Sequence, residues 1–153
     1  MKRIEDNPIA IKSKQFAVRC IRLYKFLCEQ KHEFTLSRQI LRSGTSIGAN
    51  IWESMKAESP ADFVHKLRIS LKEANESLYW ILLLEETEYI SQKEADSMNN
   101  DCEELIRMLT SIIKSKLKSA SYAIARDEEV EYSPSAHDFE PTNYNISEQN
   151  FNS

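Results

Sequence analysis

The strongest constraint on this chain is its shortage of turn-forming residues, because 153 residues contain only two glycines and four prolines. Sheet folds need many tight turns, and those turns depend on glycine and proline. Long helices joined by few connections need far fewer of both. The sequence therefore predicts an all-α protein, and its length suits one domain with one hydrophobic core.

Four stretches of the chain carry apolar side chains every three or four residues, which is the spacing of one helical face. We expect helices at about residues 8–31, 37–57, 60–88 and 91–120. Connections of a few residues make each helix fold back on the one before it, which gives an antiparallel up-down-up-down four-helix bundle over residues 1–121. The expected capping residues are Asn7, Thr35 or Ser37, Ser59, and Ser91 with Glu94.

Residues 122–153 differ from the rest in charge, with one basic residue against seven acids, whereas residues 1–121 hold 19 Lys/Arg against 17 Asp/Glu. This acidic tail lacks periodicity and is expected to be mostly irregular, either disordered or docked on a partner. Docking would use its spaced apolar residues, which are Tyr132, Phe139, Tyr144, Ile146 and Phe151.

Several classes of protein are disfavoured by what the sequence contains. The longest apolar run, residues 78–84, is too short to cross a bilayer, and the N-terminus lacks a signal peptide, so we expect a soluble cytoplasmic protein with no membrane partner. The three cysteines, Cys20, Cys28 and Cys102, fall on apolar stripes and are expected to be reduced core residues.

Metal binding and catalysis are also disfavoured. The pairs Glu29–His32 and Asp62–His65 resemble half-sites of a di-metal bundle, but the expected topology places them at opposite ends of the bundle. No glycine-rich phosphate loop or nucleophile motif occurs. We therefore expect no metal, no cofactor and no enzymatic activity.

The segment at residues 36–54 contains both glycines, Gly44 and Gly48, and each costs a helix about 1 kcal/mol relative to alanine. Two interpretations follow: another helix packs closely there, which we favour, or a ligand approaches the glycine face. Ser46 and Asn50 are one turn apart and could hydrogen-bond across helices, which would fix the register of the bundle.

Two further groups of residues suggest surfaces. Tyr79, Trp80 and Leu83 widen the apolar surface of the third helix, and this predicts contacts between copies of the chain. Basic side chains in the first two helices suggest a surface for nucleic acid, and a solvated face is the alternative. These basic residues are Lys12, Lys14, Arg19, Arg22, Lys25, Arg38 and Arg42.

The segment around the glycines resembles the four helix bundle protein family, also called the 23S rRNA intervening-sequence protein family. The likeness covers about residues 8–120. It rests on the run Ser-Arg-Gln-Ile-Leu-Arg at residues 37–42, on Phe63 and Leu67, and on the motif residues Ser46, Ile47, Ala49, Asn50, Ile51 and Glu53.

This resemblance implies a homopentameric ring. Some members of the family are similar to accessory variability determinant proteins of diversity-generating retroelements, which bind a reverse transcriptase and nucleic acid on a basic ring surface. We therefore expect a non-enzymatic, oligomeric accessory factor associated with RNA or DNA. The alternative is a protein-interaction scaffold that uses the acidic aromatic tail and binds no nucleic acid.

Overall fold

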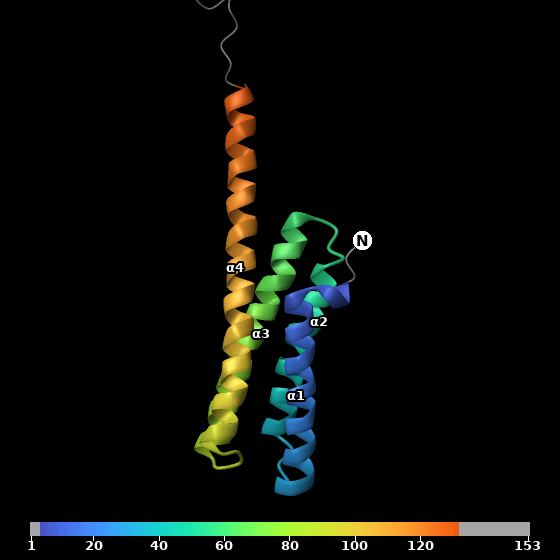
Figure 1. Cartoon of the computed structure of the whole chain (residues 1–153), viewed down its shortest axis with the longest axis vertical. Coiled ribbons are helices and arrows are strands. Elements are labelled where there is room, and N and C mark those ends of the chain that lie inside the picture. Colours follow the sequence, from blue (N-terminus) through green and yellow to red (C-terminus); the bar gives the residue numbers. More distant parts are fainter. Residues whose placement is uncertain (1–3, 132–153) are drawn as a thin grey trace, which may run out of the picture. The chain divides into compact units, whose positions relative to one another are not determined.

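The computed structural model describes residues 4–131, and all its regular elements are helices (Figure 1). A short 3-10 helix, η1 (Ile4–Asp6), precedes α1 (Pro8–Lys31), α2 (Leu36–Ser54), α3 (Pro60–Glu86) and α4 (Gln92–Glu131). The prediction of an all-α chain with four helices is confirmed.

Helix α4 is longer than expected, because it runs to Glu131 rather than ending near residue 120. The added residues, 121–131, contain no glycine or proline and include two alanines, one arginine and three glutamates, which favour helix. The irregular tail therefore cannot begin at residue 122, and its aromatic residues from Tyr132 onward lie outside the described part of the chain. Among the described residues, 4–119 belong to one compact unit and 120–131 belong to another.

Within the first unit, successive helices run in opposite directions (Figure 1). Side chains that are at most 1% exposed come from every helix and form one core, as the four-helix bundle requires. Phe16 of α1, Ile47 of α2, Ile81 of α3 and Leu105 of α4 are examples. None of the helices in the described residues is long and apolar enough to cross a membrane.

Three of the four helix starts use the caps that the sequence indicates. Asn7 Oδ1 accepts a bond of 3.2 Å from the Ile9 amide, and Ser59 Oγ accepts one of 3.1 Å from the Asp62 amide. At the start of α4, the Ser91 amide donates to Glu94 Oε2 at 2.8 Å. The Glu94 amide donates back to Ser91 Oγ at 3.2 Å, which completes a capping box.

The start of α2 corrects the sequence prediction, because neither Thr35 nor Ser37 caps it with its side chain. Instead, the buried Glu33 carboxylate accepts bonds of 2.7–2.9 Å from the amides of residues 35, 36 and 37. Burial acts to raise the pKa of Glu33, but these amide hydrogen bonds outweigh it and hold that pKa below its usual value.

Helices α1 and α2 pack closely at the glycines. A Cβ atom on Gly44 would lie 2.3 Å from Cys20 Sγ and 2.9 Å from Cys20 Cβ, so a larger residue does not fit there. A Cβ atom on Gly48 would lie 3.5 Å from the Ser13 carbonyl oxygen, which is an ordinary contact. The preferred interpretation of tight helix packing therefore holds at Gly44, and both glycines are buried.

Buried serines join α2 to α3. Ser70 Oγ donates to the Ile47 carbonyl oxygen at 2.8 Å, and the hydroxyls of Ser77 and Ser43 are 2.8 Å apart. Asn50 makes no cross-helix hydrogen bond to another of the described residues, and its Nδ2 donates instead to the Ser46 carbonyl oxygen of its own helix at 2.9 Å. The register of the α2–α3 pair therefore comes from serine hydroxyls rather than from the Asn50 amide.

Two of the cysteines are buried in the core, as expected. Burial raises the pKa of Cys20 and of Cys102 to about 12, so both stay as thiols. Cys102 Sγ donates to the Ala74 carbonyl oxygen at 3.2 Å, which ties α4 to α3. Cys28 is only half-buried, with its sulfur 3.7 Å from Ser37 Oγ.

Candidate nucleic-acid interface

Helix α1 has the most one-sided charge in the bundle, with six Lys/Arg and a single acid, Glu29. Its buried side chains face α2 and the core. The opposite side carries exposed Ile11, Val18 and Ile21 together with Lys14 and Lys25, a spacing that aligns them along one outward face. This face is basic and partly apolar.

Three of the seven basic residues singled out in the sequence are engaged within the chain. Lys12 Nζ lies 2.8 Å from Glu104 Oε2 of α4. Arg19 pairs with Asp101 of α4 and also donates to the Ser97 carbonyl oxygen and hydroxyl. These contacts hold α1 against α4, so the two side chains are only partly available to a phosphate.

Arg42 is the third engaged residue, and it lies on α2 rather than α1. Its guanidinium pairs with Glu76 and Glu73 of α3. Hydrogen bonding to Glu76 raises the pKa of Arg42, and the same contact lowers the pKa of Glu76. The pair stabilises the α2–α3 contact.

The other four basic residues are Lys14, Arg22, Lys25 and Arg38. All are exposed, and none makes an ion pair with another residue in the range that the structure describes. Lys14, Arg22 and Lys25 lie on α1, whereas Arg38 lies on α2 next to Ser37, at the end of the bundle where α1 finishes. These residues define the uncommitted positive charge of the candidate interface.

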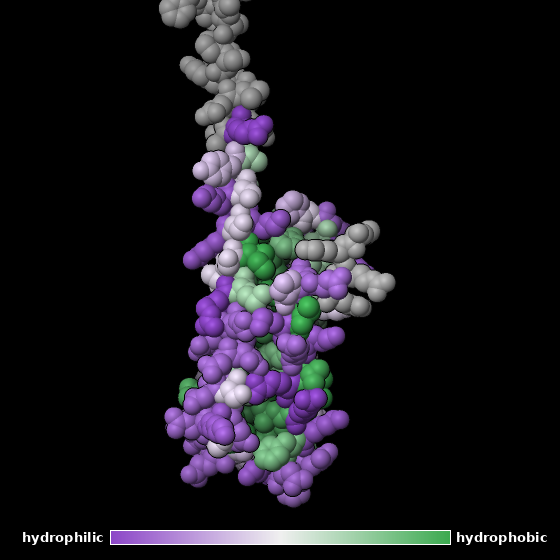
Figure 2. Space-filling model, viewed as in Figure 1, coloured by the Kyte–Doolittle hydropathy of each residue, from purple (hydrophilic) through white to green (hydrophobic). Residues whose placement is uncertain are grey.

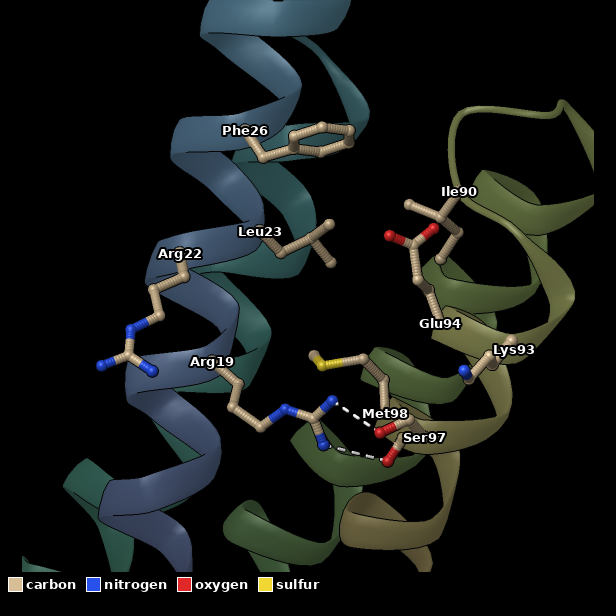
Figure 3. A pocket seen from close by; sticks show the side chains of 9 residues that line it. All are labelled: Arg19, Arg22, Leu23, Phe26, Ile90, Lys93, Glu94, Ser97 and Met98. Atoms are coloured by element: carbon tan, nitrogen blue, oxygen red, sulfur yellow. Dashed lines mark hydrogen bonds between the residues drawn. The ribbon is translucent and has the colours of Figure 1, made fainter.

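A groove of about 610 Å³ runs between α1 and the first turns of α4, beside this basic face. Its apolar lining consists of Leu23, Phe26, Ile90 and Met98. Figure 2 shows apolar surface gathered between these helices and bordered by hydrophilic residues. In the close view, Phe26 extends from α1 toward Ile90, and Lys93 projects from the α4 side (Figure 3).

Sequence reasoning missed both Phe26 and Lys93. The available signal was that Phe26 does not belong to the buried stripe of α1, and a large aromatic residue off the stripe is left on the surface. Lys93 gave no signal, because it is one of many charged residues and only the fold brings it opposite α1.

The residues of α3 that are expected to form contacts between copies are exposed to different degrees. Tyr79 is 53% exposed, and its ring centroid lies 5.1 Å from that of Trp80. Trp80 and Leu83 are half-buried, and Trp80 Nε1 donates to Glu76 Oε1 at 3.1 Å. The neighbouring Leu82 is 46% exposed.

The motif residues of α2 divide between core and surface. Ile47 and Ile51 are fully buried, and Ser46 and Asn50 are half-buried. Ala49 and Glu53 are exposed, and Glu53 pairs with Lys66 of α3 at 2.6 Å.

The structure also places His32 and His65, the two histidines of the pairs that resemble metal half-sites. His32 ends α1 and His65 lies near the start of α3, which are opposite ends of the bundle (Figure 1). Within residues 4–131, no group of three or more His, Cys, Asp or Glu side chains could hold a metal ion.

Comparisons with known proteins agree with this fold. The family model described as 23S rRNA-intervening sequence protein matches residues 5–111. A crystal structure of a protein with unknown function from the S23 ribosomal protein family of Bacteroides thetaiotaomicron is 57% identical, with a TM-score of 0.69. That alignment covers 69% of this chain and 98% of the other. No curated protein matches. This chain therefore belongs to the 23S rRNA-intervening sequence protein family.

Proposed function

We propose that this protein is a non-enzymatic accessory factor that binds RNA or DNA in the cytoplasm. The observation that supports the proposal is the basic outward face of α1, where Lys14, Arg22 and Lys25 make no ion pair within the described residues. Phosphate contacts dominate the affinity of proteins for nucleic acid, and uncommitted lysine and arginine side chains supply them.

The test is binding to a labelled RNA by fluorescence anisotropy over a series of salt concentrations. Affinity should fall linearly with salt on logarithmic axes, because each phosphate contact releases counterions. Lys14→Gln with Lys25→Gln should weaken binding and reduce the salt slope by roughly one per lysine that contacts phosphate. The matched control is Lys72→Gln on the exposed side of α3, which should leave both quantities unchanged. No binding at low salt would contradict the proposal.

In this proposal the protein acts as a homo-oligomer, and the family resemblance implies a pentamer. Support comes from exposed Tyr79 and Leu82 on α3, since such apolar surface favours contacts with further copies. Light scattering after size exclusion gives the mass directly. Tyr79→Lys should shift that mass toward the monomer, and a monomeric wild type would contradict the proposal.

A reverse transcriptase is the protein partner that the resemblance implies for such an accessory factor. Co-purification of the full chain with a reverse transcriptase encoded nearby tests that partner. If the acidic tail alone retains a partner protein and the full chain binds no nucleic acid, the scaffold function is favoured instead.

A further inference from the structure

The groove between α1 and α4 combines an apolar floor with cationic edges. Leu23, Ile90 and Met98 supply the floor, and the Phe26 ring stands beside them while still 37% exposed. We infer that this groove binds an unpaired nucleotide, with its base against the Phe26 ring and its phosphate toward Lys93, while Arg22 on the outer side of α1 contacts the adjoining phosphate of the strand. The inference rests on the proposed nucleic-acid binding and specifies the class of strand that is recognised.

The charges around the groove favour an anion. Arg19 lies at its edge but is held by Asp101 and Ser97 of α4. Glu94 is the acid at the edge, and its carboxylate accepts hydrogen bonds from the Ser91 amide and hydroxyl. Arg22 and Lys93 make no ion pair among the residues described, so the positive charge available to a ligand is theirs.

The shape of the groove suits a flat ring better than a phosphate alone. A volume of about 610 Å³ falls within the range of small-molecule sites, and its lining is mostly apolar. Phe26 has Lys31 Nζ 5.8 Å from its ring centroid, so a cation already lies beside the aromatic surface. Bases stack on exposed aromatic rings in proteins that bind single strands.

Arg22 links this groove to the basic face of α1. Figure 3 shows its side chain directed away from the groove, toward the outer side of α1. Lys14 and Lys25 lie on that outer side. A strand whose phosphates follow these three residues passes the mouth of the groove and can turn one base inward. A duplex keeps its bases in its own stack and offers only phosphates.

The experiment compares an unstructured RNA with a duplex of equal length, using the full chain and fluorescence anisotropy at one salt concentration. Phe26→Leu removes the ring but keeps an apolar side chain, and Phe26→Tyr keeps the ring. The matched control is Phe34→Leu, because Phe34 is 50% exposed and lies outside the groove. Circular dichroism confirms that each variant is folded.

Stacking is worth about 1–3 kcal/mol per base, so Phe26→Leu should weaken single-strand binding roughly 5- to 140-fold and leave duplex binding unchanged. Phe26→Tyr and Phe34→Leu should bind like the wild type. An unchanged affinity of Phe26→Leu for the single strand would overturn this inference and leave the proposed function intact. An altered oligomer mass in Phe26→Leu with unaltered RNA binding would overturn it too, because the groove would then be a protein contact. Absence of binding to either RNA would refute the proposed function itself.

Discussion

The two glycines of α2 predict opposite effects of the same substitution. In Gly44→Ala, the new Cβ atom would lie 2.3 Å from Cys20 Sγ and 2.9 Å from Cys20 Cβ. Carbon atoms in favourable contact are about 3.5–4.0 Å apart, so α1 and α2 must separate or deform. Such overpacking costs about 1–3 kcal/mol and is partly offset by a gain of about 1 kcal/mol in helix propensity.

Gly48→Ala is the matched control, because its Cβ atom would meet Ser13 at 3.5 Å and needs no movement. It should stabilise the protein by up to about 1 kcal/mol. The propensity gain is common to both variants, so Gly44→Ala should be less stable than Gly48→Ala by about 1–3 kcal/mol. At about 2–4 °C per kcal/mol, this is a difference in Tm of roughly 2–12 °C.

The assay is urea unfolding followed by far-UV circular dichroism, at one fixed protein concentration so that association does not alter the comparison. Adding Cys20→Ala to Gly44→Ala removes the 2.3 Å clash and should recover part of the lost stability. If Gly44→Ala is as stable as Gly48→Ala, the close approach of α1 and α2 at Cys20 is refuted.

Three further predictions concern a cap, a thiol and a turn. Glu33→Ala should lower stability by about 1–2 kcal/mol because three amides of α2 lose their acceptor. The folded state lowers the pKa of Glu33, so its contribution is present above the unfolded pKa of about 4.3 and is lost as pH falls through the lower folded pKa. Unfolding curves of the wild type and the variant should converge in acid. A stability difference between them that does not change with pH would refute the capping role of Glu33. In the native protein, only Cys28 should react quickly with a thiol reagent, because burial raises the pKa of Cys20 and of Cys102 to about 12. The Cys28→Ser variant should lack this fast reaction, and a fast reaction that persists in the variant would contradict the prediction. Glu88→Gly should raise the Tm, since residue 88 has a φ of 61° that costs a non-glycine residue about 1 kcal/mol; a lower Tm would count against strain at this turn.

The candidate interface was only partly predictable from the sequence. The sequence identifies Lys14, Arg22 and Lys25 as basic residues of one helix. It does not distinguish them from Lys12 and Arg19, which lie on the same helix. Whether a lysine meets phosphate or an acid depends on which helix packs beside it. Here α4 brings Glu104 and Asp101 against α1 and engages those two side chains.

The sequence by itself determined the helical class, the number of helices and most of their starts. Those properties depend on contacts within a few residues, such as apolar spacing and the caps Asn7 and Ser59. Tertiary structure decided the tight contact at Gly44, the engagement of Lys12 and Arg19 by α4, and the groove beside Phe26. Each of these depends on a burial or a distance between segments that local patterns do not encode, because the same side chain can face the core, a partner helix or solvent.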